Sequence, residues 1–184
     1  MSDEIYPVEL VAPDIEPYRK GNIGIDFVTS FDSGKPGPHV MINAVTHGNE
    51  ICGAIALDHL FKASVRPKHG KLTLGFINHL AYSNFDSENP GASRFVDEDF
   101  NRVWVEDRLE GLEVTAELRR ARELRPVFDT VDLLLDIHSM GTYSKPLMIC
   151  NGLKKEREFT VDVNFPAHIT VSYTHLRAHE TVDY

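Results

Sequence analysis

The sequence predicts an α/β fold, in which a central mixed, largely parallel sheet is flanked by helices. Three observations predict it. Residues 40–45 are apolar almost throughout, as expected for a strand that is buried on both faces. Apolar residues then recur at helical spacing from 51 to about 63, and a second strand-like run follows at 71–78. The order strand, helix, strand favours parallel pairing through a crossover helix.

The residues before this unit predict a lead-in and one further strand. Prolines at 7, 13 and 17 indicate an extended segment, and residues 21–31 resemble a strand or a hairpin arm. A stretch rich in Gly, Pro and Ser at 32–38 is typical of a turn. At the start of the first long helix, Asn49 is a suitable N-cap because its side chain can accept a hydrogen bond from a free backbone N–H.

The residues after the unit predict a long loop, a helix and two strands. The stretch 81–104 is rich in Asn, Asp, Ser and Gly and lacks periodicity, and so long a loop is usually functional or disordered. We expect a charged amphipathic helix over 114–131 and a leucine-rich strand over 132–138. The charged run 154–158 is interpreted as a solvated turn, and residues 165–171 as a strand.

Composition and charge restrict the class of protein. The chain has 184 residues, of which 42% are hydrophobic and 26% charged, so it can build the core of one globular domain. Its net charge of −9 disfavours nucleic-acid and anionic-membrane partners. No apolar run is long enough to span a membrane and the first residues carry no export signal, so we expect a cytoplasmic protein. Cys52 and Cys150 lack the spacing of a disulfide framework or a thiolate zinc site, and both are expected to be buried.

Three residues predict a zinc site. His47 and Glu50 lie between a predicted strand and helix, and His138 ends another predicted strand. Carboxyl ends of parallel strands meet at one edge of a sheet, where the sites of α/β proteins usually form. Two His and one Glu can bind zinc and leave its fourth position open for water. Asp136 lies on the same side of its strand as His138 and is expected to orient that ring. The alternative is that both His fill structural positions.

The long loop adds a second group of charged residues. It contains Arg94 and Arg102, eight residues apart and flanked by acidic residues that could orient them. A guanidinium is planar and always charged, which suits it to capturing a carboxylate or stabilising an oxyanion. The alternative is a solvated charged loop. Phe95, Phe100 and Trp104 are expected to pack this loop against the domain.

These groups together resemble the succinylglutamate desuccinylase and aspartoacylase family, relatives of the zinc carboxypeptidases. The resemblance rests on the segments 46–50, 94–102 and 136–138, in that order and spacing, and covers roughly 40–171. It implies a zinc carboxypeptidase-like fold, truncated in this chain. It also implies that His47, Glu50 and His138 bind one Zn²⁺, that Arg94 polarises the scissile carbonyl, and that Asn101 with Arg102 holds a substrate carboxylate.

The implied activity is zinc-dependent hydrolysis of an amide bond adjacent to a carboxylate, of the N-acyl amino acid deacylase or carboxypeptidase type. The substrate is a small carboxylate-bearing N-acyl amino acid or peptide-like molecule, while the acyl specificity and the oligomeric state stay open. Because the net charge repels an anion at long range, the cleft must be locally positive. The resemblance also implies a further glutamate as general base, in a segment well beyond the strand of His138; nothing after residue 171 resembles that segment, so we expect this base to be missing. The alternative is a non-catalytic or degenerate metal-binding domain without that base.

The end of the chain departs from the family. We expect residues 1–171 to form the amino-terminal part of a catalytic domain and residues 172–184 to be a non-native tail, because this segment resembles translated cloning sequence. Glu180, His175 and His179 lie in this tail and are therefore left out of the predicted site. The chain as it stands is expected to be impaired in turnover.

Overall fold

The computed structural model describes residues 7–141, 144–166 and 168–171. The chain divides into two compact units, residues 1–139 and 140–184. The predicted metal ligands and both arginines belong to the first unit. The predicted tail lies outside the described residues.

The first unit is built on a four-stranded sheet in the order β1-β3-β2-β4. Its strands are β1 (Val28–Asp32), β2 (His39–Ala44), β3 (Lys71–Phe76) and β4 (Leu133–Ile137). β2 is parallel to both β3 and β4, and β1 is antiparallel to β3. The predicted mixed, largely parallel sheet is therefore confirmed.

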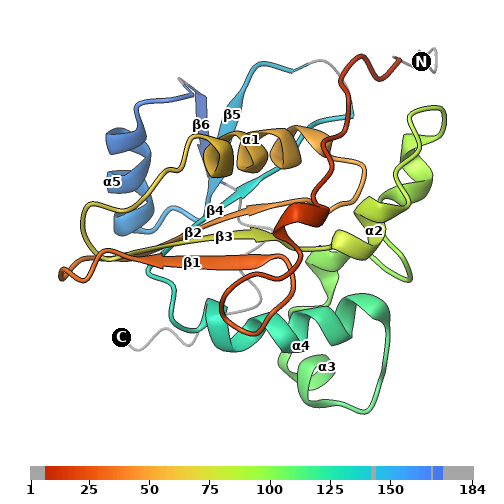
Figure 1. Cartoon of the computed structure of the whole chain (residues 1–184), viewed down its shortest axis with the longest axis horizontal. Helices are drawn as coiled ribbons and strands as arrows, with labels where there is room; N and C mark the ends of the chain where they lie inside the picture. The colour runs from red at the N-terminus through yellow and green to blue at the C-terminus, as the bar shows by residue number, and fades with distance from the viewer. Residues whose placement is uncertain (1–6, 142–143, 167, 172–184) are drawn as a thin grey trace. The chain divides into compact units, whose positions relative to one another are not determined.

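Helices cover both faces of this sheet (Figure 1). On one face α1 (Ile51–Lys62) buries Ala54 and Leu57 against residues such as Leu74. On the other face α4 (Ala116–Phe128) buries Leu118, Ala121 and Leu124 against Met41 and Ile77. Each fully buried aliphatic side chain stabilises the folded state by about 1.5–3 kcal/mol, so these two apolar layers hold the helices on the sheet.

Short helices interrupt the long loop between β3 and α4. They are α2 (His79–Ser83), η2 (Pro90–Ser93), η3 (Phe100–Arg102) and α3 (Glu106–Glu110), and a further turn, η1 (Glu16–Tyr18), precedes β1. Phe100 is buried and packs edge-on against Trp104, whose ring in turn contacts Phe128 of α4. The predicted packing role is confirmed for these two aromatic residues, whereas Phe95 is 40% exposed.

Three details of the first unit differ from the sequence prediction. Asn49 does not cap α1, because Glu50 occupies the N-cap position without a side-chain cap bond. Thr115 caps α4 through a hydrogen bond from the N–H of Leu118, so the helix is shorter than predicted at both ends. Cys52 is partly exposed, while Cys150, in the second unit, is buried as expected.

The second unit contains β5 (Leu147–Cys150), α5 (Lys154–Val163) and β6 (His168–Val171), and its two strands pair in parallel. The predicted strand near the end of the chain is thus present, but the solvated turn predicted at 154–158 is wrong. Those residues form the start of α5, because the Glu156 side chain accepts the backbone N–H of Leu153 at 3.1 Å and so satisfies a free donor at the helix start.

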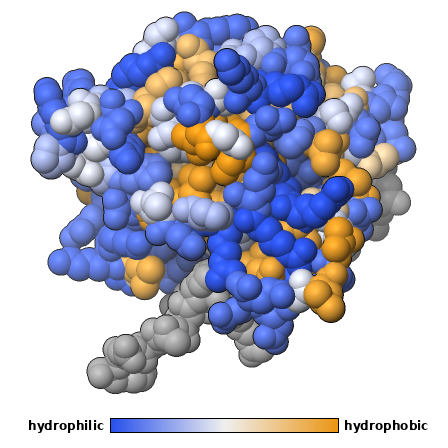
Figure 2. All heavy atoms as spheres, turned by 60° about the horizontal axis from the view of Figure 1, so that its bottom comes forward, coloured by the Kyte–Doolittle hydropathy of each residue, from blue (hydrophilic) through white to orange (hydrophobic). Residues whose placement is uncertain are grey.

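The surface carries hydrophobic residues in several patches among hydrophilic ones. Figure 2 turns the side of the first unit with α3 and α4 toward the viewer and shows this mixture. The exposed apolar residues of that part of the chain include Val105, Leu112 and Val114. Among the helices of the described residues, none is long and apolar enough to cross a membrane.

Candidate functional site

The three predicted ligands lie together at the carboxyl ends of two neighbouring parallel strands. Ala44 ends β2 and pairs with Ile137 of β4, so the residues that follow the two strands are adjacent. After β2 the chain turns through Val45, whose φ is +54°, into the turn that carries His47 and Glu50. A β-branched residue rarely adopts this left-handed conformation, and such strain is found mainly at functional sites.

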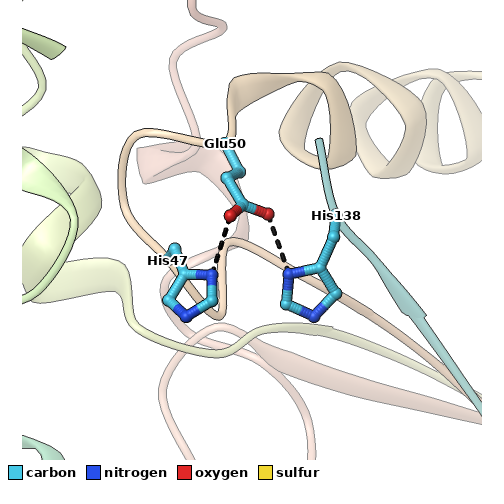
Figure 3. A group of neighbouring side chains, drawn as sticks. All are labelled: His47, Glu50 and His138. Carbon is cyan, nitrogen blue, oxygen red and sulfur yellow. Dashed lines mark hydrogen bonds and ion pairs between the residues drawn. The ribbon is translucent and has the colours of Figure 1, made fainter. Parts of the chain in front are cut away.

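The Glu50 carboxylate lies between the two imidazole rings (Figure 3). Its Oε1 is 2.7 Å from Nδ1 of His47, and its Oε2 is 2.8 Å from Nδ1 of His138. One ligand atom from each of the three residues lies within 4.8 Å of the others. His47 and Glu50 are buried, so few water molecules compete for these atoms. This donor set and spacing fit a divalent metal such as zinc.

A carboxylate faces the far nitrogen of each ring. Nε2 of His138 is 2.9 Å from Oδ2 of Asp136, and Nε2 of His47 is 3.2 Å from Oδ1 of Asp99. The Thr46 hydroxyl donates to Asp136 and fixes it in turn. A carboxylate behind a histidine orients the ring and raises its basicity toward a metal. Both rings are therefore held with Nδ1 directed at the candidate metal position.

The acidic groups of the site favour positive charge between them. Burial raises the pKa of Glu50, but hydrogen bonds from His138 and His47 outweigh it and hold that pKa far below the usual range. Burial lowers the pKa of His138, but hydrogen bonds to Asp136 and Glu50 raise it to about 10. The site thus retains a proton at neutral pH. A bound divalent cation would neutralise the negative charge of the same carboxylates in place of that proton.

Arg94 lies beside the three candidate ligands. Its Nη1 is 3.2 Å from Oε1 of Glu50, and its Nη2 is 3.6 Å from Oδ2 of Asp99. The side chain is 39% exposed, so the guanidinium borders both the ligands and solvent. Such a group can stabilise negative charge that develops at the edge of the site.

Asn101 and Arg102 lie seven and eight residues after Arg94 in the same loop, in η3. The N–H of Asn101 donates to Oδ1 of Asp99 at 2.9 Å. Arg102 is exposed, and its Nη1 donates to the carbonyl oxygen of Asn101. In the described part of the chain, neither side chain forms a hydrogen bond or ion pair with the three candidate ligands. The structure therefore places them on the loop of the site rather than at the ligands.

Two acidic residues of the site and its loop were not predicted from the sequence. Asp99 contacts both His47 and Arg94, and the only signal for it was that it lies among acids flanking the arginines. Glu117 is fully buried beneath the loop. The sequence feature that indicates Glu117 is its spacing from Ala121 and Leu124, which places a carboxylate on the apolar face of α4. His79, the first residue of α2, lies apart from these groups and stacks its ring on Phe27, with 4.5 Å between the ring centroids.

Fold and site together define an α/β protein with a candidate metal centre at the carboxyl edge of a parallel sheet. The chain belongs to the succinylglutamate desuccinylase/aspartoacylase family, because the model of that family's catalytic domain matches residues 36–179. Named members of this family are hydrolases. The match extends into the segment 172–184, and the non-native origin of that segment stays a prediction.

Individual relatives agree with this assignment. The chain is 29% identical over 144 residues to aspartoacylase from Xenopus tropicalis, covering 70% of this chain and 42% of the relative. Its fold is similar to a succinylglutamate desuccinylase/aspartoacylase from Rhodobacter sphaeroides, with a TM-score of 0.59, 24% identity, and 80% of this chain and 45% of that one covered. Murine aminoacylase 3 gives a TM-score of 0.56 at 20% identity, covering 74% of this chain and 48% of that one. The chain thus spans less than half the length of these relatives.

Proposed function

We propose that the chain carries the metal site of a zinc-dependent hydrolase that cleaves an amide bond adjacent to a carboxylate. The observation that supports this most is the convergence of the Nδ1 atoms of His47 and His138 on the Glu50 carboxylate. These three residues would hold one Zn²⁺. When bound, zinc would supply Lewis acidity and lower the pKa of a bound water to about 7.

Arg94 is proposed to stabilise the oxyanion that forms from the scissile carbonyl. Its guanidinium already lies within 3.2 Å of Glu50, so a carbonyl oxygen near the metal would also be near Arg94. Asp99 holds the other side of the guanidinium at 3.6 Å and restricts its rotation.

Arg102, with Asn101, is proposed to bind the substrate carboxylate. Its exposed guanidinium keeps donors available for a bidentate carboxylate. A small N-acyl amino acid or peptide-like molecule satisfies both arginines, with its carbonyl at Arg94 and its carboxylate at Arg102. The family name and the names of the relatives, aspartoacylase and aminoacylase 3, agree with substrates of this kind.

We propose no general base among the described residues. Glu156 accepts the N–H of Leu153 at the start of α5, and Glu158 is exposed and 3.6 Å from Lys154. Glu180 lies outside the described residues. The second candidate function is therefore a metal-binding domain without efficient turnover, since a positioned base typically contributes about 10²–10⁴-fold.

Zinc content and hydrolysis of N-acetyl and N-succinyl amino acids, measured on the same preparation, test the proposal. The hydrolase assignment predicts turnover that disappears on chelation and returns with zinc. Arg102→Ala should raise KM by about tenfold or more with a smaller change in kcat, because it removes a charged hydrogen bond to the substrate. Arg119→Ala, on α4, is the matched control. Zinc binding without turnover would favour the second function, and turnover that resists chelation would refute the first.

A further inference from the structure

We infer that Glu117 is a positioning residue, which holds the loop 94–102 in the conformation that brings Arg94 and Asp99 to the candidate ligands. What the loop does there rests on the proposed function. How the loop is held rests on contacts of the described residues alone. The two parts can therefore be tested separately.

The Glu117 carboxylate binds the loop backbone directly. Its Oε1 accepts the N–H of Val96 at 2.7 Å, and its Oε2 accepts the N–H groups of Asp97 and Glu98 at 3.1 and 3.3 Å. Oε1 also accepts a hydrogen bond from the Asn78 side chain at 3.1 Å. The side chain is fully buried, and it rises from the first turn of α4.

Three successive backbone N–H groups of an irregular loop thus share one acceptor. Such groups have no partners from a helix or a sheet, and a buried N–H without a partner is rare because it is costly. A carboxylate has about four acceptor positions, which matches the four donors present. The Glu117 carboxylate therefore supplies the acceptors for three loop N–H groups, while Glu98 of the loop adds hydrogen bonds from Arg108 and Thr115.

We call the hydrogen bonds from the loop N–H groups to Glu117 the anchor. Contacts on both sides of the anchor connect it to the site. Asp97 accepts the N–H of Ala116, so the loop and the start of α4 hold each other. At the other end the N–H of Gly48, within the ligand turn, donates to the carbonyl oxygen of Arg94 at 3.0 Å. The side chain of Arg94 reaches Glu50 from one end of the anchored segment, and that of Asp99 reaches His47 from the other.

Amide hydrogen exchange tests the anchor without any reference to activity. In the wild-type chain the amides of Val96, Asp97 and Glu98 should exchange at least about tenfold more slowly than in an unstructured peptide. Glu117→Gln keeps the size of the side chain but replaces one acceptor oxygen with a donor. These amides should then exchange at least about tenfold faster, while those of β3 change by less than about threefold.

Leu124→Ala is the matched control, because it removes a buried apolar side chain of the same helix that cannot accept the loop N–H groups. This variant should accelerate amide hydrogen exchange without a particular effect on residues 96–98. If Glu117→Gln does not fold, Glu117→Asp retracts the carboxylate while keeping both oxygens and should deprotect the same three amides. Unprotected amides in the wild type, or equal acceleration throughout the chain, would overturn the inference.

Zinc affinity tests whether the anchor acts through Asp99. Asp99→Asn should weaken zinc binding by about tenfold, as is typical when a carboxylate behind a histidine ligand is lost. Glu117→Gln should weaken it by about as much in the wild type, but by less than about twofold in the Asp99→Asn background. Equal factors in both backgrounds would show that Glu117 does not act through Asp99. If the wild type binds no zinc, the proposed function fails while hydrogen exchange still decides the anchor.

Discussion

The backbone N–H of Gly48 donates to the carbonyl oxygen of Arg94 at 3.0 Å. This bond joins the turn of His47 and Glu50 to the loop of both arginines. The two segments approach so closely that a Cβ atom at Gly48 would lie 2.3 Å from the carbonyl oxygen of Ser93 and 2.4 Å from the carbonyl carbon of Ala81. Only glycine permits this contact, because the colliding atoms belong to the backbone and cannot rotate away.

Gly48→Ala should therefore separate the two segments. We expect it to lower the free energy of unfolding by about 3 kcal/mol or more, as overpacking against rigid backbone does. Urea denaturation measures this change. Gly91→Ala in the same loop is the control, since its Cβ would meet no atom within 4 Å. Equal stability of the two variants would contradict the close approach.

Asp136→Asn should weaken zinc binding without unfolding the protein. The Asp136 carboxylate accepts from the Thr46 hydroxyl and faces Nε2 of His138 at 2.9 Å, so its charge orients the ring and increases its basicity. The expected loss of affinity is about 10–100-fold, measured by competition with a chelator. Asp129→Asn, at the exposed end of α4, should leave the affinity unchanged. A loss of the same size in both variants would show that Asp136 has no specific role.

His79 should make the stability of the protein sensitive to mild acid. Burial, together with the charges of Arg120 and Arg19, lowers its pKa to about 4, and the charges of Asp26 and Glu16 only partly oppose this. In the unfolded chain His79 has a pKa of about 6.5 and binds the proton more readily. The contribution of neutral His79 to the free energy of unfolding is therefore complete above about pH 6.5 and is lost as the pH falls toward 4.

His79→Phe keeps a ring next to Phe27 but cannot titrate. Relative to this variant, the wild type should lose about 1–3 kcal/mol of stability between about pH 6.5 and 4. Urea denaturation at several pH values measures the difference. Identical pH dependence of the two proteins would contradict the lowered pKa of His79.

The sequence predicted those parts of the fold and site that follow from strand order. Residues that follow parallel strands must meet at one edge, which is why His47, Glu50 and His138 could be placed together. Asp99 and Glu117 could not be predicted in the same way, because their roles depend on the path of an irregular loop. The helix α5 was missed because Glu156 caps it and Lys154 lies 3.6 Å from Glu158 one turn later, contacts that a charged run does not reveal by itself.

Leu134→Lys should reduce aggregation. β4 is the last strand in the order of its sheet, and its residue Leu134 is 49% exposed. A lysine on an edge strand disfavours the addition of a strand from another molecule. The onset of light scattering on heating should therefore rise. Leu112→Lys, which replaces a 99% exposed residue of a loop, should have a smaller effect. An equal or larger effect of Leu112→Lys would indicate that general hydrophobicity, not the strand edge, drives aggregation.

Zinc binding by His47, Glu50 and His138 is the central property of the proposed site, and metal analysis of the dialysed protein measures it. We expect about one zinc per chain in the wild type, the same in His59→Ala on the exposed side of α1, and almost none in His47→Ala, since two remaining ligands bind zinc weakly. A wild-type chain without zinc, or a His47→Ala variant that retains it, would contradict the account.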